Sequence, residues 1–219
     1  MALYDDARGR EGFEAGVRMA VQRILASPRF VFRLEQAPAA IRAGQPYGNG
    51  DLDLASRLSF FLWGTVPDAE LVKAARQGAL KNPAVLEKQV RRMLADPRSR
   101  ALSTRFASQW LRLQDTDQTR PDPLIFPQWD HTLTDAFVEE TQLFFDSIVR
   151  DDRSVLDVIS ADYTFVNERL AKHYRIPNVY GSHFRRITLT DDARKGLLGK
   201  GAILLVTSHA HRTSPVLRG

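Results

Sequence analysis

Residues 51–63 read DLDLASRLSFFLW, and this stretch decides the class of fold. Its apolar side chains recur at intervals of three and four residues, which is the repeat of one helix face. Asp51 stands where a helix N-cap belongs, because a carboxylate there accepts hydrogen bonds from the first backbone N–H groups. The stretch therefore predicts an amphipathic helix packed on a core. The residues that share its apolar face are Leu54, Leu58, Phe61 and Leu62.

The same spacing returns on the C-terminal side of this segment, after capping residues and prolines that are typical of helix starts. Further helices are expected to begin near Pro67, Asn82 and Asp96, and later to span residues 132–149, 164–174 and 194–208. Residues 114–129 contain three prolines and predict a loop, whereas residues 179–189 have the character of a strand. The sequence thus predicts an all-α fold, an irregular bundle of about eight to ten helices with long Pro-rich loops.

Charge is mixed along the chain. The 31 Lys and Arg against 26 Asp and Glu leave a net charge of +5. Basic and acidic side chains alternate within the expected helices, and the densest basic groups are the pairs at residues 91–92 and 185–186. Nucleic-acid binding needs a basic stripe on one face, so no nucleic-acid partner is expected. A binder of nucleic acid or acidic polysaccharide would require the arginines to gather on one exposed face.

Other function classes are excluded by what the chain lacks. With no Cys, it cannot form disulfides, thiolate metal sites or a covalent c-type haem attachment, so no cofactor is expected in this chain. The longest apolar run, residues 196–206, is interrupted by Lys200 and is shorter than the roughly 20 residues that a membrane span needs. The first residues lack the basic and apolar regions of a secretory signal.

Two opposite charges fall on apolar helix faces. Arg57 lies between Leu54 and Phe61 in helical spacing, and Glu140 lies in the same way between two phenylalanines. A buried charge is unfavourable unless it is paired, so we expect Arg57 and Glu140 to meet as a structural ion pair, or each to find another partner nearby. The competing interpretation makes Glu140 a catalytic acid or base with a raised pKa.

His209 and His211 form the one local cluster of histidines in the sequence. Side chains two residues apart point to different faces of a helix, so joint metal binding requires an extended backbone, which the nearby Pro215 permits. A third ligand would have to come from elsewhere. The candidates are Glu140, Asp162 and His173. The alternative is that both histidines sit at a helix C-terminus, where the helix dipole favours them.

Several blocks of sequence resemble one known family. They are residues 54–63 (LASRLSFFLW) with 67–68 (PD), 92–97 (RMLADP), 106–111 (FASQWL), 140–141 (ET), 162–171 (DYTFVNERLA) and 173–174 (HY). Together they resemble the uncharacterised helical domain that accompanies planctomycete-type cytochrome c proteins. Residues 212–219 (RTSPVLRG) resemble the start of the cytochrome-c-like domain that follows it, and residues 13–36 resemble the end of the domain that precedes it.

This resemblance implies three parts: residues 1–40 as the helical remnant of a preceding domain, 51–178 as the central uncharacterised domain, and 179–219 as the truncated start of a cytochrome-c-like domain. It implies an exported, periplasmic or cell-surface location and a multidomain protein whose other domains carry haem c. Its partners would be neighbouring domains of the same polypeptide. The family offers no catalytic residues to transfer.

The function expected from these observations is a noncatalytic scaffold or interaction module in a redox or substrate-processing assembly. The chain ends at Gly219 without a closing polar tail, which indicates a fragment of a larger protein. The alternative is a metal-assisted hydrolase or oxidoreductase in which His209 and His211 bind the ion and Glu140 transfers protons. The sequence leaves open whether the chain is an enzyme.

Overall fold

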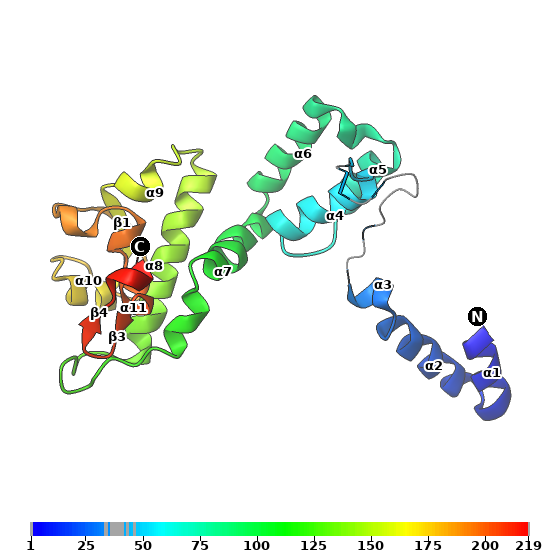
Figure 1. Ribbon diagram of the computed structural model, residues 1–219, viewed down its shortest axis with the longest axis horizontal. Helices are drawn as coiled ribbons and strands as arrows, with labels where there is room; N and C mark the ends of the chain where they lie inside the picture. Colours follow the sequence, from blue (N-terminus) through cyan, green and yellow to red (C-terminus); the bar gives the residue numbers. More distant parts are fainter. Residues whose placement is uncertain (1, 33–34, 36–41, 43, 46, 219) are drawn as a thin grey trace. The chain divides into compact units, whose positions relative to one another are not determined.

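The computed structural model describes residues 2–32, 35, 42, 44–45 and 47–218 (Figure 1). The chain divides into two compact units, Met1–Asp53 (unit 1) and Leu54–Gly219 (unit 2). The boundary falls inside the first turns of the helix that residues 51–63 predict.

Unit 1 is a helical hairpin of α1 (Ala2–Glu11) and α2 (Phe13–Leu25), followed by the short α3 (Pro28–Val31). The helices pack closely at Gly16, where a Cβ atom would lie 2.9 Å from the Cβ of Arg8. Many apolar side chains of α2 and α3 remain exposed. The assignment of residues 1–40 to a preceding domain stays a prediction. Residues 1, 33–34 and 36–40 lie outside the described residues.

The first part of unit 2 is a set of helices joined by tight corners. Asp68 and Asn82 accept hydrogen bonds from backbone N–H groups at the starts of two of them, which confirms the expected helix starts. The elements are α4 (Asp51–Leu62), α5 (Ala69–Arg76), η1 (Ala79–Lys81), α6 (Pro83–Ala95), η2 (Pro97–Arg100), the π-helical η3 (Leu102–Ala107), α7 (Ser108–Trp110) and η4 (Leu113–Asp117).

The second part is built on the long helix α8 (His131–Arg150), which matches the expected helix over residues 132–149 (Figure 1). Shorter elements pack on it. They are α9 (Asp157–Ser160), β1 (Tyr163–Val166), α10 (Glu168–Tyr174), β2 (Arg185–Thr188), η5 (Asp192–Arg194), η6 (Leu197–Gly199), α11 (Gly201–Val206), β3 (Ser208–His209), β4 (Arg212–Thr213) and α12 (Pro215–Arg218).

Two small antiparallel sheets correct the expectation of an all-α fold: the described chain is predominantly helical but not purely so. β1 pairs with β2, with Tyr163 opposite Thr188, and β3 pairs with β4. The strand expected within residues 179–189 is therefore confirmed at β2. The helix expected over 164–174 begins only at Glu168, because Asn167 caps it and the β-branched and aromatic residues before it pair as β1.

Unit 2 holds two hydrophobic clusters. One gathers residues of α4, α5 and α6 around Leu71 and Met93, both fully buried. The other gathers residues of α8, β1, α10 and α11. The pairing of β1 with β2 joins residues on both sides of position 178/179. The expected division into a domain of residues 51–178 and the start of another at 179–219 stays a prediction. Within the described residues, no helix combines the length and apolar character that crossing a membrane requires.

A buried carboxylate and an apolar cavity form the candidate site

Glu140 lies on the buried face of α8, with 1% of its surface exposed. Its carboxylate accepts hydrogen bonds from the hydroxyl groups of Thr164 at 2.5 Å and Tyr174 at 2.6 Å. The backbone N–H of Gly201, at the start of α11, points to the same place, 2.9 Å from the Tyr174 oxygen and 3.4 Å from the carboxylate. Three elements, β1, α10 and α11, thus converge on one acidic side chain.

Glycine is required where α11 meets α8. A Cβ atom at residue 201 would lie 2.0 Å from the ring of Phe137, which no packing tolerates. The missing side chain lets the Gly201 N–H reach Tyr174 and Glu140. The glycines on either side of Lys200 therefore serve close packing, since a Cβ atom at residue 199 would also lie 2.5 Å from the backbone of Arg194.

Lys200 is the positively charged residue buried near Glu140, Thr164 and Tyr174. Its side chain is fully buried, and its ammonium donates to the carbonyl oxygen of Tyr163 at 3.2 Å and lies 4.3 Å from the ring centroid of Phe144. Burial lowers the pKa of Lys200 to about 8, while the negative charge of Glu140 opposes that shift. Burial raises the pKa of Glu140, and Lys200 opposes the rise together with the hydrogen bonds from Thr164 and Tyr174.

These contacts correct the expected ion pair. Arg57 is exposed on α4, and the groups that contact Glu140 come from β1, α10 and α11. The predicted Arg57–Glu140 pair is therefore wrong, whereas the alternative that Glu140 finds another partner nearby is confirmed. The helical spacing located the inward-facing carboxylate but could not name its partner, because Lys200 lies 60 residues further along the chain.

Beside the network around Glu140 lies a cavity of about 270 Å³. It is bounded by the Pro-rich loop within residues 114–129 and by α8, α10 and α11. Tyr174 and Gly201 belong both to its wall and to the Glu140 network. The rest of the wall is mainly apolar and aromatic. Its other members are Thr119, Pro121, Ile125, Phe126, Pro127, Gln128, Trp129, Leu133, Phe137, His173, Arg194, Leu204, Leu205, Ser208 and His209.

The Pro-rich loop is held in place at both ends. The backbone N–H of Asp122 donates to the carbonyl of Ala210, in the turn between β3 and β4, at 3.2 Å. Arg169 of α10 donates to the carbonyl of Gln128 at 2.6 Å and to the carboxylate of Asp130 at 3.1 Å. Residues 114–129, expected to be a loop, begin with the last turn of η4 and then form this wall. Long ordered loops of this kind are usually functional.

The polar groups at the cavity are cationic or neutral. The guanidinium of Arg194 lies 3.8 Å from the ring centroid of Tyr174. Partial burial, with the positive charges of Arg194 and Arg169, lowers the pKa of His173 and so favours its neutral form. His173 lines the cavity with its ring against Phe137.

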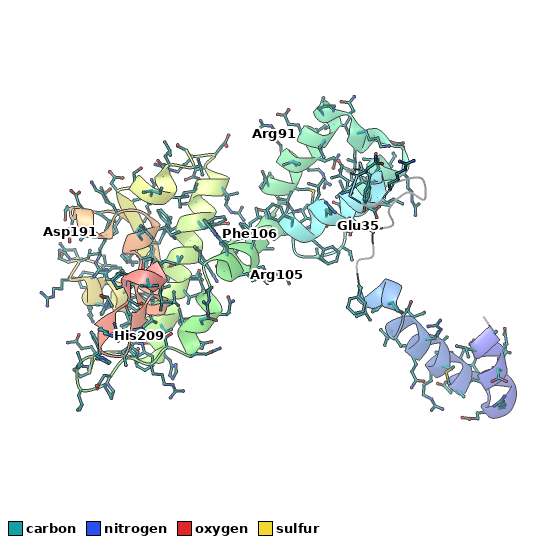
Figure 2. The ribbon with its side chains drawn as sticks, in the orientation of Figure 1. Glu35, Arg91, Arg105, Phe106, Asp191 and His209 are labelled. Atoms are coloured by element: carbon teal, nitrogen blue, oxygen red, sulfur yellow. The ribbon has the colours of Figure 1, made fainter. Side chains whose placement is uncertain are left out.

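His209 and His211, the expected metal ligands, are separated by the local backbone. His209 lies in β3 (Figure 2), opposite Arg212. It lines the cavity, whereas His211 is exposed in the turn between the strands. Nowhere in the described chain do three histidine or acidic side chains gather in a group that could hold a metal ion. Of the proposed third ligands, Glu140 is buried beneath Tyr174, Asp162 is exposed, and His173 lines the cavity with His209.

Sequence reasoning missed most members of this site. Thr164 and Tyr174 carry hydroxyl groups that no spacing connects to Glu140. Lys200 did leave a signal, because it is the one charge inside the apolar run 196–206, and a charge there needs a buried partner. Arg194 and Trp129 meet at one cavity only through folding.

The fold and the site define a mainly helical domain with a buried Glu–Lys network beneath an apolar cavity. The chain belongs to the family described as "Protein of unknown function (DUF1592)", whose model matches residues 50–176. No curated protein and no solved structure matches the chain significantly.

Proposed function

We propose that the chain is a noncatalytic interaction module of an exported multidomain protein associated with c-type cytochrome domains. In this role it positions a redox or substrate-processing partner domain of the same polypeptide at the periplasm or cell surface. The observation that carries the proposal is an exposed group of aromatic side chains held on a rigid base. The resemblance stated above supplies the identity of the partner.

This aromatic surface consists of Phe61 on α4, Phe106 on η3 and Trp110 on α7. Phe61 is 51% exposed, Phe106 41% and Trp110 56%. The ring of Phe106 meets Phe61 edge-on at 5.3 Å between centroids and stacks on Trp110 at 6.2 Å. Large aromatic side chains that are both exposed and grouped are typical of interface centres, where they bury much area at little entropic cost.

The base of the aromatic surface is fixed by the fold. Phe106 lies 6.4 Å from Phe145 of α8, measured between ring centroids, and Phe145 packs against the α4–α6 cluster. Arg105, next to Phe106 in Figure 2, donates to the carbonyl of Gly64 at 2.5 Å and so ties η3 to the end of α4. A surface that is ordered before binding loses little entropy on binding.

The surroundings of Glu140 also support a noncatalytic role. Its carboxylate is buried and accepts hydrogen bonds from groups of its own chain, and Tyr174 lies between it and the cavity. A catalytic acid or base must come within hydrogen-bonding reach of its substrate. The arrangement suits a residue that holds β1, α10 and α11 together.

Hydrogen exchange measured by mass spectrometry tests the interaction role. Backbone amides of residues 102–111 should exchange more slowly in a longer polypeptide, extended beyond both ends of this chain, than in the chain alone. The double variant Phe61→Ser, Trp110→Ser should abolish that difference. Leu156→Ser, at the residue just before α9, is the matched control, because Leu156 is 68% exposed and lies outside the aromatic surface. Equal exchange in both polypeptides would show that no neighbouring domain covers the surface.

The metal-assisted hydrolase or oxidoreductase is the second candidate, favoured by one observation: His209 and Tyr174, the latter bonded to Glu140, line the same cavity. Elemental analysis of the longer polypeptide and of its His209→Ala, His211→Ala variant distinguishes the two. The interaction role predicts no histidine-dependent metal. Stoichiometric metal that the double variant loses would replace the first proposal with the second.

A further inference from the structure

The wall of the cavity under the Pro-rich loop is mainly apolar. Leucine, proline and aromatic side chains make up most of it, and none of the residues that line it, all within the described part of the chain, is Asp or Glu. Its volume, about 270 Å³, is near the lower end of the range of small-molecule sites, roughly 300–1,000 Å³. Such a space suits a compact apolar group of about the size of one substituted ring.

Arg194 brings a positive charge to this apolar wall. Its guanidinium carbon lies 3.8 Å from the ring centroid of Tyr174, and the ion pairs formed among the described residues do not include Arg194. Nearby Lys195 differs, because it pairs with Asp192 at 2.7 Å. A guanidinium carries five N–H donors, and stacking on a ring leaves its edge available for a planar acceptor such as a carboxylate.

Trp129 supplies a second, independent observation. It lines the cavity, and its indole N–H is buried with no acceptor among the described residues. Leaving such a buried donor unsatisfied is unfavourable. Trp63, the buried tryptophan of the other cluster, shows the usual arrangement, since its indole donates to the carbonyl of Met93 at 2.8 Å. Because Trp129 lines the cavity, a ligand bound there contacts this residue and changes the surroundings of its indole N–H.

We propose that this cavity binds a small monocarboxylate with an apolar, preferably aromatic, body. The body lies among Leu133, Phe137 and Leu204, and the carboxylate pairs with Arg194 at the edge. An inorganic anion lacks the group that fills the apolar space, and a neutral hydrocarbon leaves Arg194 without a counter-charge. This binding site is separate from the aromatic surface, so it stands or falls independently of the proposed interaction role.

The test uses the full chain and two probes of nearly the same shape, phenylacetate and uncharged phenylacetamide. Binding is followed by calorimetry and by the NMR shift of the Trp129 indole N–H. Phenylacetate should bind at one site per chain. Its dissociation constant should be at least about tenfold lower than that of the amide, because a charge-assisted pair adds more than 1.4 kcal/mol. The indole signal should move on titration, because Trp129 lines the cavity.

Variants of Arg194 locate the carboxylate. Arg194→Gln should weaken phenylacetate binding about tenfold or more and leave the amide unchanged, whereas Arg194→Lys, which keeps the charge, should weaken it less. Arg186→Gln is the matched control, because Arg186 also lies over a tyrosine ring, 3.7 Å from the centroid of Tyr163, but is not part of the cavity wall. It should bind phenylacetate as the unaltered chain does.

Circular dichroism confirms that each variant is folded before binding is measured. The proposal is overturned if phenylacetate does not bind at millimolar concentration, if acid and amide bind equally, or if folded Arg194→Gln keeps full affinity. Loss of affinity in Arg186→Gln as well would show a general effect of positive charge and would equally overturn the site.

Discussion

Glu140 and Lys200 are two charges that the fold has removed from water, and each is acceptable only because of the other and of the surrounding donors. The carboxylate receives hydrogen bonds from Thr164 and Tyr174, and the ammonium donates to a backbone carbonyl. Replacing one member of a buried pair is far more harmful than replacing an exposed one, because the remaining charge stays buried without compensation.

Glu140→Gln is therefore expected to lower the free energy of unfolding by about 3 kcal/mol. The amide cannot accept from both hydroxyl groups as the carboxylate does, and Lys200 loses its counter-charge. Urea unfolding followed by circular dichroism measures the change.

Its neighbour Glu139 is the control, because Glu139→Gln removes only an ion pair with Arg100, 2.8 Å long and partly exposed at both ends. That variant should lose less than about 1 kcal/mol. Equal losses in the two variants, or an unchanged stability in Glu140→Gln, would contradict a structural role for Glu140.

At the scale of elements, one residue joins the Pro-rich loop to α8. Asp130 caps the helix by accepting from the backbone N–H of Leu133 at 2.8 Å and from the hydroxyl of Thr132 at 2.7 Å. It also accepts from Arg169, which holds the end of the loop through Gln128. The hydrogen bond from Thr132, followed by that from Leu133, lowers the pKa of Asp130 to about 2.

This shift predicts a pH dependence. Because the folded-state pKa of Asp130 lies below the unfolded value of 3.8, its contribution to stability is present above about pH 4 and is lost as the pH falls toward 2. Asp130→Asn keeps the cap, since asparagine is an equally good N-cap, but removes the titration. The stability lost between about pH 5 and pH 3, measured by urea unfolding, should be smaller in this variant than in the unaltered chain.

Asp135→Asn, an exposed change in the same helix, provides the comparison and should lose stability as the unaltered chain does. If Asp130→Asn follows the same pH profile as the unaltered chain, the contacts of Asp130 do not survive in solution.

At the scale of the whole molecule, every residue of the two hydrophobic clusters comes from position 54 or later. The described residues of unit 1 are not among them, and Phe13, Ile24 and Phe30 are more than half exposed. Removing residues 2–46 should therefore change the melting temperature of unit 2 by less than about 4 °C, which corresponds to about 1 kcal/mol for a chain of this size. Differential scanning calorimetry measures it, and a broad, non-cooperative transition in the shortened chain would contradict independent folding.

The helical character of the chain could be predicted because its signals are local. Periodicity over residues 51–63 and 132–149, with caps such as Asp68 and Asn82, lies within a few turns of each helix. The first turn of the helix expected over 164–174 is a strand instead, because β1 pairs with β2, 19 to 25 residues further along the chain, and this pairing overrides the local pattern. The four-residue length of each strand leaves little alternation to detect.

The sequence by itself determined that Glu140 faces inward, because helical spacing alone assigns a residue to a face. It also determined, through the absence of cysteine, which covalent cofactor attachments are impossible in the chain. Only the tertiary structure decided that Lys200, Thr164 and Tyr174, rather than Arg57, surround that carboxylate, and that Arg194 and Trp129 share one cavity. The physical reason is that charge pairing and cavity formation depend on distances in space, and periodicity carries no information about which distant element packs against a face.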